Sequence, residues 1–351
     1  MSYIAKPVAH HPALPHNALG LTHRDYEGSM STLCAGCGHD SITAAVIEAA
    51  YELSLPAHRI AKLSGIGCSS KAPTYFMYRS HGFNSVHGRM PSVTTGANMA
   101  NKDLIYIGVS GDGDTASIGL GQFAHAVRRR LNMTYIVMNN GCYGLTKGQF
   151  SATNDKSSPS KKGEANPFDA IDLCQMAIQL GAGFVARSFS GDKKQLVPLI
   201  KAAIGYNGFA LLDVISPCVT FNNHPQSTKS FEYVRAHNQV MGPLDFVPER
   251  DEITADYEEG SSTAVTLHDG GRIVLHKLDG AHDPRDPDAA IQTIRSNAAD
   301  GRVATGLLYI NEEQRDLHDV IGSSARPLNE IDCKELCPGG KAMEAINARF
   351  R

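Results

Sequence analysis

Residues 104–114 read LIYIGVSGDGD, an apolar run that ends in a turn of alternating glycine and aspartate. A second apolar run, MTYIVMNN at 133–140, ends in a pair of asparagines. Apolar runs of this length without polar alternation are typical of strands that are buried on both faces, as in a parallel sheet. We therefore expect two parallel strands here, each followed by a polar turn.

The alternation of strands and helices extends to both sides of these runs. Further strands are expected at 59–67, 184–189 and 209–216, and helices at 40–54, 89–100, 168–181 and 196–204, with one more that ends near Arg130. This order predicts an α/β fold, in which a parallel sheet is covered by helices on both faces. Residues 40–217 are expected to form it.

The chain divides into three predicted parts. Residues 1–33 are expected to form an N-terminal arm, residues 34–225 the α/β domain, and residues 226–351 a C-terminal extension. The strand and helix pattern weakens in the extension, which contains an acidic run at 249–259. We interpret this run as a solvated helix or loop, and expect the extension to pack on the main domain or on a partner subunit.

Composition excludes several classes of protein. Hydrophobic residues make up 42% of the 351 residues and charged residues 20%, so the chain can bury a core and is neither disordered nor a small disulfide scaffold. The formal charge of −3 gives no reason to expect a nucleic-acid partner. We expect no secretory signal, because no apolar region follows a basic start, and no apolar stretch has the length that a membrane helix needs. We expect a cytoplasmic protein with reduced cysteines.

The two polar turns suggest a metal site. Asp112 and Asn140 are 28 positions apart, and each follows an apolar strand. Ligands of parallel α/β sheets bind beyond the carboxyl ends of the strands, so both turns should open onto one crevice. Carboxylate, amide and carbonyl oxygens suit Mg²⁺ that bridges to a pyrophosphate. The alternative is two ordinary turns without a ligand.

Four cysteines are predicted to meet at the same end of the sheet. Cys34 and Cys37 form a CxxC sequence before the first helix, Cys68 follows the first strand, and Cys218 follows the last. Four thiolates suit either a 4Fe–4S cluster or a structural Zn²⁺. Zinc knuckles usually pair two short CxxC clips, and only one clip is present.

The other four cysteines are assigned no thiolate role. Cys174 lies in an apolar helical pattern and is interpreted as a core residue. Cys142 lies in the turn after Asn140, where its main-chain carbonyl matters more than its sulfur. Cys333 and Cys337 are only two thiols, too few to complete a four-ligand site, so we interpret them as non-ligating.

The motifs together resemble a known family. GDG followed by NN at this spacing is similar to the pyrophosphate-binding domain of thiamine diphosphate enzymes. CxxCGH, GIGCS, His87-Gly88-Arg89, GDGD, NNxxYGLTKGQ and SPC, in that order, resemble the β subunit of 2-oxoacid:ferredoxin oxidoreductases over residues 30–225. Ala35 departs from the family, which often has Pro after the first cysteine; the change alters loop stiffness and leaves the ligands in place.

The resemblance implies a thiamine diphosphate-binding fold and an oxidative decarboxylation. Thiamine diphosphate with Mg²⁺ would act on a 2-oxoacid, coenzyme A would accept the acyl group, and one 4Fe–4S cluster would pass electrons to ferredoxin. The glutamate that activates thiamine would come from a separate α subunit, because only one α/β domain can be placed here. An αβ heterodimer or an (αβ)₂ assembly is therefore expected, without nucleic acid or membrane.

The resemblance also implies the site residues. The cluster ligands would be Cys34, Cys37, Cys68 and Cys218, and the Mg²⁺ ligands Asp112, Asn140 and the carbonyl of Cys142. The expected cofactor-binding residues are Gly67, Ser69, His87, Gly88, Gly111, Asp112, Gly113, Asp114, Asn140, Tyr143, Gly144 and Leu145. His39 and His87 would face the diphosphate or the substrate.

Lys147 bears on the choice of substrate. In the sequence TKGQ it resembles the 2-oxoglutarate-type members, where a cation could meet the distal carboxylate that pyruvate lacks. We therefore expect 2-oxoglutarate, with pyruvate or broad 2-oxoacid specificity as the alternative. A redox-free thiamine enzyme would leave the four thiols unexplained, and an electron-transfer or zinc module would leave the GDG and NN turns unexplained.

Overall fold

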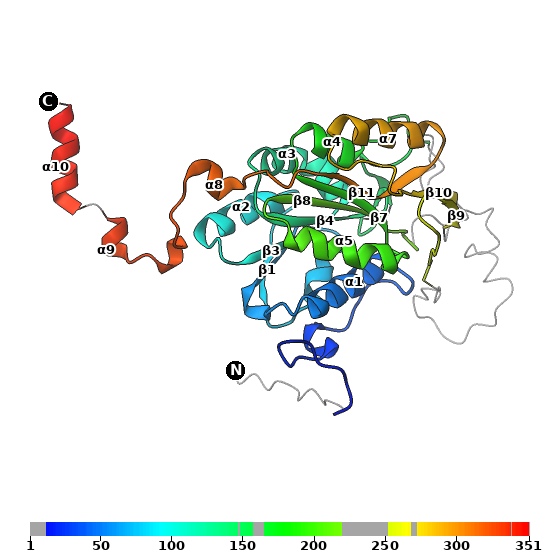
Figure 1. The fold of residues 1–351 in the computed structure, drawn as a ribbon, viewed down its shortest axis with the longest axis horizontal. Coiled ribbons are helices and arrows are strands. Elements are labelled where there is room, and N and C mark those ends of the chain that lie inside the picture. The colour runs from blue at the N-terminus through cyan, green and yellow to red at the C-terminus, as the bar shows by residue number, and fades with distance from the viewer. Residues whose placement is uncertain are drawn as a thin grey trace.

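A computed structural model describes residues 12–146, 148–156, 165–219, 252–267, 272–337 and 339–350. Its described residues form a nine-stranded sheet in the order β2-β1-β3-β4-β8-β7-β11-β10-β9 (Figure 1). The strands are β1 (Ile60–Ser64), β2 (His81–Asn84), β3 (Ile105–Gly111), β4 (Met133–Asn139), β7 (Phe184–Phe189), β8 (Phe209–Ile215), β9 (Ser262–Thr266), β10 (Arg272–Lys277) and β11 (Val303–Ile310). A separate hairpin pairs β5 (Cys142–Tyr143) with β6 (Gln149–Phe150).

The strands from β2 to β7 in this order are all parallel, which confirms the predicted α/β class. The sheet does not end at residue 217, however. β11 pairs antiparallel with β7, β10 runs parallel to β11, and β9 completes the edge. Part of the expected C-terminal extension therefore continues the sheet itself.

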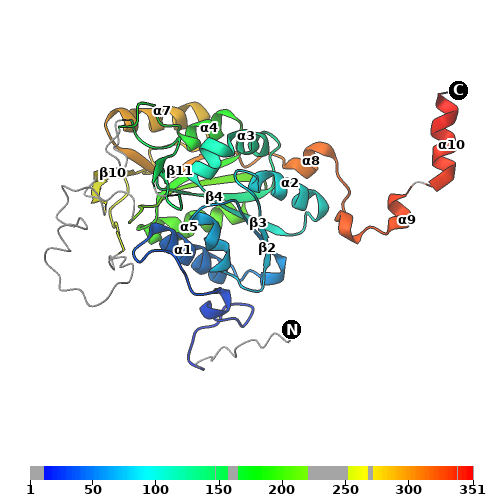
Figure 2. The ribbon, with the colours of Figure 1, turned by 180° about the vertical axis from the view of Figure 1, so that it is seen from behind.

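Helices cover both faces of the sheet (Figures 1 and 2). On one face lie α1 (Gly38–Glu52) and α5 (Lys193–Gly205); on the other lie α2 (Met90–Ala100), α3 (Leu120–Arg128), α4 (Leu173–Gln179) and α7 (Pro287–Ala299). Alternate residues of β4 belong to different apolar cores, with Ile136 in the core beneath α1 and α5 and Tyr135 in the other. This two-sided burial is the reason that the strand has no polar alternation.

One predicted helix is shorter than expected, and the acidic run, predicted as a helix or a loop, is a loop where it is described. The helix expected at 168–181 begins only at Leu173, because the Asp172 side chain caps it by accepting the N–H of Gln175 at 2.9 Å. The acidic run is described from residue 252 and forms neither helix nor strand there. It lies against α5, where Lys193 pairs with Glu252 and Lys194 with Asp256.

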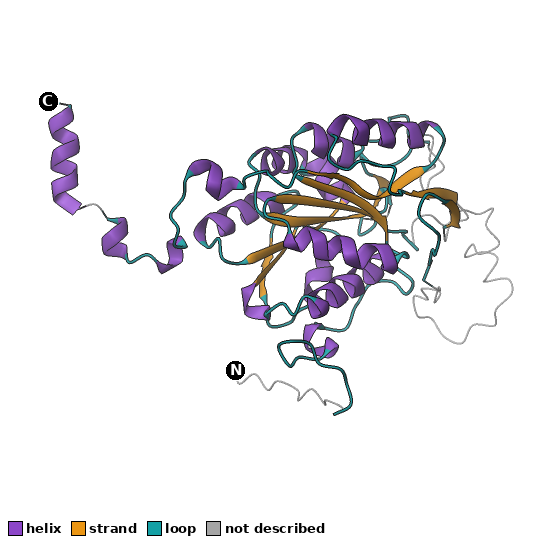
Figure 3. Cartoon of the chain, viewed as in Figure 1, coloured by secondary structure: helices purple, strands orange, loops and turns teal. Residues whose placement is uncertain are grey.

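The end of the chain leaves the body of the protein. After α8 (Leu317–Ile321), the short α9 (Cys333–Leu336) and α10 (Gly339–Arg349) extend away from the sheet and its helices, as the coloured elements of Figures 1 and 3 show. Neither α9 nor α10 has a buried residue. Within the described residues, every helix is too short or too polar to cross a bilayer.

Candidate functional site

The two polar turns lie side by side at the carboxyl edge of the sheet. β3 ends at Gly111, which pairs with Met138 near the end of β4. Asp112 therefore begins its turn beside Asn139 and Asn140, as expected for two neighbouring parallel strands. Asp112 is followed directly by a π-helical turn, η4 (Gly113–Ile118), before α3 begins.

A pocket of about 80 Å³ opens at this edge and gathers most of the predicted residues. Its lining comes from five different segments of the chain. The lining residues are His39, Ile66, Gly67, Cys68, Ser69, His87, Gly111, Asp112, Gly113, Asp114, Met138, Asn140, Cys142, Tyr143, Gly144, Leu145 and Thr146. Gly88 does not line it but lies next to His87. Lys147 is outside the described residues.

Asp112 is buried and held from several directions. One carboxylate oxygen, Oδ1, accepts the N–H of Asn140 at 3.2 Å. The other, Oδ2, accepts the hydroxyls of Thr153 at 2.7 Å and of Ser151. Burial raises the pKa of Asp112, and these three hydrogen bonds oppose the rise because they stabilise the charged form. The carboxylate is therefore fixed in one orientation.

The turn after β4 presents the other predicted Mg²⁺ ligands. The N–H of Cys142 donates to the Asn140 side-chain oxygen at 3.1 Å, which closes a tight turn through Gly141. Among the described residues, no three or more His, Cys, Asp or Glu side chains form a group that could hold a metal ion. The predicted Mg²⁺ set contains one carboxylate only; an amide and a main-chain carbonyl would complete it.

Asp114 has a different environment from Asp112. Its carboxylate accepts the main-chain N–H of Gly88 at 2.7 Å and the hydroxyl of Ser110 at 2.9 Å. A Cβ on Gly65 would lie 1.8 Å from Asp114 Oδ2. Any residue other than glycine at position 65 would therefore clash with the carboxylate of Asp114. Asp114 thus joins three of the predicted motifs by internal contacts.

Of the four predicted cluster ligands, Cys68 lines the pocket. A Cβ on Gly144 would lie 3.4 Å from the sulfur of Cys68 and 3.9 Å from that of Cys218, so both thiols lie next to this glycine. Burial raises the pKa of Cys37 to about 12, and the charges of Cys218 and Cys34 add to the rise. Cys34 and Cys218 thus lie within electrostatic range of both Cys37 and Cys68, although the thiols of the described residues are not arranged as a group of three or more around a metal ion.

Cys142 also approaches this group through its sulfur. Its thiol is hydrogen-bonded to that of Cys218. This hydrogen bond is the main cause that raises the pKa of Cys142, and burial is the second. Cys174 is fully buried in α4, as expected for a core residue. Cys333 and Cys337 are exposed in and next to α9, with their sulfurs 3.8 Å apart, on the segment that leaves the body.

The two predicted histidines differ in burial. His39 is only 2% exposed, and burial lowers its pKa to about 4, so it is neutral at physiological pH. Its Nδ1 lies 2.5 Å from the hydroxyl of Ser216. The main-chain N–H of Ser216 donates to the carbonyl of Asn139, which fixes Ser216 beside the end of β4. His87 is exposed at the rim of the pocket.

Four residues that contact this site were not predicted to do so. Ser151 and Thr153 bind Asp112, Ser216 binds His39, and Asn139 binds Thr153. Asn139 and Ser216 belong to quoted motifs, NN and SPC, so their positions next to the predicted ligands were visible in the sequence. Ser151 and Thr153 lie in a polar loop, where nothing in the sequence distinguishes them from other surface hydroxyls.

Comparisons with known proteins agree with this geometry. The family described as "Thiamine pyrophosphate enzyme, C-terminal TPP binding domain" matches residues 65–214. A 2-oxoacid:ferredoxin oxidoreductase subunit beta from Sulfolobus sp is 39% identical over 227 residues, which are 64% of this chain and 72% of the relative.

Two further matches point the same way. The 2-oxoglutarate oxidoreductase subunit KorB of Mycobacterium tuberculosis is 39% identical over 54% of this chain, and the alignment spans about half, 51%, of that relative. A solved 2-oxoglutarate:ferredoxin oxidoreductase from Magnetococcus marinus, with 2-oxoglutarate, coenzyme A and succinyl-CoA bound, superposes with a TM-score of 0.68 at 29% identity. The superposition covers 90% of this chain and 94% of that one.

Proposed function

Because the chain belongs to the β subunits of the 2-oxoacid:ferredoxin oxidoreductases, we propose that it is one half of a 2-oxoglutarate:ferredoxin oxidoreductase. In the oxidative direction, 2-oxoglutarate and coenzyme A give succinyl-CoA and CO₂, and two electrons pass through one 4Fe–4S cluster to ferredoxin. The reverse direction is a reductive carboxylation. The runner-up substrate is pyruvate or a broad range of 2-oxoacids.

One observation carries the proposal. Asp112, Asn140 and Cys68 line the same pocket, and the sulfurs of Cys68 and Cys218 both lie next to Gly144. Thiamine diphosphate, when bound, would stabilise the negative charge left as CO₂ departs. A redox centre at the same sheet edge could accept the electrons one at a time. A redox-free thiamine enzyme needs no such centre, so thiols at this edge favour the redox enzyme.

The residues of the turns fit Mg²⁺. Asp112 is a buried carboxylate whose partners are neutral donors, Thr153, Ser151 and Asn140, so a cation would meet a fixed and uncompensated charge. The Asn140 amide oxygen and the Cys142 carbonyl would supply further hard oxygen ligands. These three groups would hold the cation that binds the diphosphate.

The donor set also fits an iron–sulfur cluster. Cys34, Cys37, Cys68 and Cys218 are thiols without disulfides, and burial raises the pKa of Cys37 and Cys68. A raised pKa means that these thiols are protonated before assembly, so loading the cluster would release protons. Zinc would use the same ligands, and metal and sulfide analysis separates the two.

His39 is proposed to orient the diphosphate. It is neutral, lines the pocket and has its Nδ1 occupied by Ser216. If the Ser216 hydroxyl donates to Nδ1, the proton of the ring resides on Nε2, which becomes a donor for a phosphate oxygen. His87 would contact the cofactor or the substrate from the exposed rim.

The pocket is too small to enclose the reaction. At about 80 Å³ it falls well below the roughly 300–1,000 Å³ of pockets that bury drug-sized ligands. A separate α subunit would cover it and supply the activating glutamate, giving an αβ heterodimer or an (αβ)₂ assembly that delivers electrons to ferredoxin in the cytoplasm. The name "subunit beta" of the relatives supports such a partner.

The proposed function is tested by an assay on the complex. The chain is purified anaerobically with its co-expressed α subunit, and methyl viologen reduction is followed with coenzyme A and a panel of 2-oxoacids. We expect the highest kcat/KM with 2-oxoglutarate and no reduction without coenzyme A. Equal or better turnover of pyruvate would support the runner-up substrate, and a complex that decarboxylates without reducing viologen would support the redox-free alternative.

A further inference from the structure

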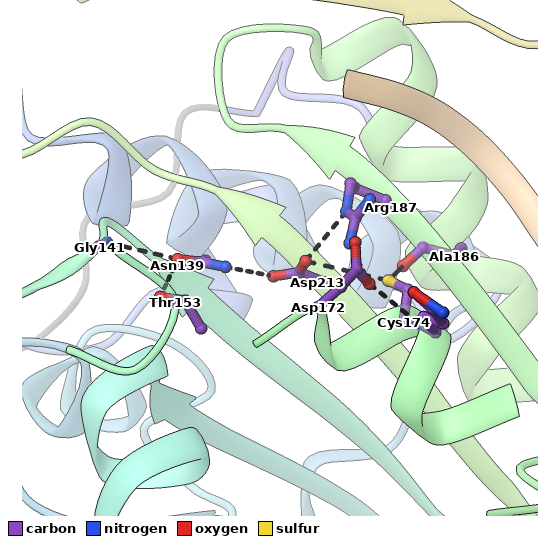
Figure 4. Close-up of polar contacts among 9 residues, drawn as sticks. Asn139, Gly141, Thr153, Asp172, Cys174, Ala186, Arg187 and Asp213 are labelled. Carbon is purple, nitrogen blue, oxygen red and sulfur yellow. Dashed lines mark hydrogen bonds and ion pairs between the residues drawn. The ribbon is translucent and has the colours of Figure 1, made fainter. Parts of the chain in front are cut away.

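A buried ion pair lies one strand away from the proposed Mg²⁺ turn and takes no part in the proposed chemistry. Arg187 on β7 and Asp213 on β8 face each other in register, with Arg187 Nε 3.0 Å from Asp213 Oδ2. A second carboxylate, Asp172, lies 2.8 Å from the same guanidinium. Arg187 and Asp213 are 6% and 2% exposed, so this pair is buried within the fold (Figure 4).

Asn139 connects the ion pair to the site. Its side-chain Nδ2 donates to Asp213 Oδ1 at 3.0 Å. Its Oδ1 accepts the N–H of Gly141 at 3.3 Å and lies 3.1 Å from the hydroxyl of Thr153 (Figure 4). Both ends of the Asn139 amide are therefore bonded, and its orientation is set by Asp213 rather than by solvent.

Thr153 has one hydroxyl proton and three oxygen neighbours, of which the hydroxyl of Ser151, 2.8 Å away, can either donate or accept. The Thr153 hydroxyl lies 2.7 Å from Asp112 Oδ2 and 3.1 Å from Asn139 Oδ1. A hydroxyl donates one hydrogen bond at a time. When a cation occupies Asp112 Oδ2, Thr153 can turn its proton to Asn139 and still be satisfied, provided that Asn139 is held with its oxygen toward Thr153.

Neither Asn139 nor Thr153 lines the 80 Å³ pocket. Both lie instead on the wall of a separate cavity of about 480 Å³, together with Arg187 and Asp213. Asn139 precedes Asn140 in the chain and accepts the N–H of Gly141, while Thr153 donates to the carboxylate of Asp112. A role in positioning that carboxylate is thus separable from direct contact with the ligand.

We infer that Thr153 and Asn139, oriented by the Arg187–Asp213 pair, are positioning residues that set the Mg²⁺ affinity of Asp112. The inference rests on the proposed function, since it presumes that Asp112 binds the cation of Mg²⁺–thiamine diphosphate. Thr153 holds the carboxylate while the cation is absent and transfers its hydrogen bond to Asn139 when the cation arrives. The buried ion pair keeps Asn139 ready to accept it.

The test measures the Mg²⁺ concentration that half-saturates thiamine diphosphate binding, by calorimetry on the anaerobically purified complex with the α subunit. Thr153→Val keeps the shape without the hydroxyl, and Thr153→Ser restores the hydroxyl. Asp213→Asn weakens the ion pair with Arg187 that orients the Asn139 amide. Thr134→Val is the matched control, because Thr134 lies on β4, as Asn139 does, and its buried hydroxyl donates to the carbonyl of Ala203 in α5, away from Asp112.

We expect Thr153→Val to raise the half-saturating Mg²⁺ about tenfold and Asp213→Asn to raise it severalfold. Thr153→Ser and Thr134→Val should stay within twofold of the wild type. Unchanged Mg²⁺ affinity in Thr153→Val, or equal losses in Thr153→Val and Thr134→Val, would overturn the positioning role of Thr153 and Asn139. Either result would leave the proposed function standing. A wild-type complex that binds no Mg²⁺–thiamine diphosphate would overturn the proposed function, and the positioning role with it.

Discussion

The main-chain nitrogen of Gly88 donates to the carboxylate of Asp114 at 2.7 Å, and this bond joins two motifs that are 26 residues apart in the chain. Asp112, two residues earlier, accepts hydrogen bonds from neutral groups in the turn after β4 and in the loop that follows β6. The two acidic residues of one glycine-rich turn therefore have separate tasks. Asp114 holds the loops together, and Asp112 remains for the cation.

This division predicts opposite effects of two substitutions. Asp112→Ala should abolish Mg²⁺–thiamine diphosphate binding, because it removes the only anionic ligand of the proposed set. Asp114→Asn can still accept the Gly88 N–H, so it should retain the cofactor and lower the melting temperature by a few degrees. Cofactor content after gel filtration checks both; stoichiometric cofactor in Asp112→Ala would show that the metal assignment is wrong.

The cluster ligands predict a pattern of iron content. Serine at Cys34, Cys37, Cys68 or Cys218 should lower iron and sulfide together, because each removes one thiolate. Serine at Cys174 or Cys333 should leave both unchanged, as should Cys142→Ala, whose proposed metal ligand is a carbonyl. Iron and acid-labile sulfide are measured on anaerobic preparations. Loss of the cluster in Cys333→Ser but not in Cys218→Ser would contradict the ligand set.

Much of the central fold could be predicted because its strands are buried on both faces. β3, β4, β7 and β8 are almost entirely buried, and their continuous apolar runs are typical of strands covered on both faces. β2 was missed because all four of its residues are exposed, so that it pairs as a polar edge strand without a hydrophobic pattern. β9 and β10 mix exposed and buried positions, whereas β11 has no exposed residue. The place of these three strands in the sheet depends on the pairing of β11 with the distant β7.

The site shows the same limit. Asp112 and Asn140 could be identified because each directly follows a strand, and the strand direction fixes where it lies. Ser151 and Thr153 reach Asp112 because the loop after β6 folds back over the turn, a tertiary contact with no local signature. Lys147 lies outside the described residues, so its assignment still rests on the sequence.

Lys62 predicts a pH dependence of stability. It is 7% exposed, its Nζ donates to the carbonyls of Phe76 at 2.6 Å and Met77 at 3.0 Å, and burial lowers its pKa from 10.5 to about 8. Between these values the unfolded chain binds a proton that the folded chain has lost, so stability rises with pH. This contribution is complete above pH 10.5 and disappears as the pH falls through 8.

The measurement compares wild type with Lys62→Met by denaturant unfolding from pH 7.5 to 10.5. The free energy of unfolding of the wild type, relative to the variant, should increase by ~2–3 kcal/mol over this range, at about 1.4 kcal/mol per pKa unit. Lys201→Met, which removes a surface lysine paired with Glu52, serves as the control and should follow the wild type. Parallel curves for wild type and Lys62→Met would show that the pKa of Lys62 is not lowered.

Lys147 predicts a change in substrate preference. If it pairs with the distal carboxylate of 2-oxoglutarate, Lys147→Met should lower kcat/KM for that substrate roughly ten- to a hundredfold, because a charge-assisted hydrogen bond contributes ~1.5–3 kcal/mol. Pyruvate has no second carboxylate and should be affected much less. An unchanged ratio of kcat/KM between the two substrates would refute the specificity claim, even if total activity falls.

The central claim is that this chain is half of an iron–sulfur thiamine diphosphate enzyme. The most direct measurement is anaerobic methyl viologen reduction with 2-oxoglutarate and coenzyme A, first by the rigorously purified chain and then after addition of the α subunit. We predict no turnover by the chain alone, even when it is loaded with iron, Mg²⁺ and thiamine diphosphate, and turnover once the α subunit is present. Turnover by the single chain would contradict the claim, as would a fully loaded complex that remains inactive on every 2-oxoacid.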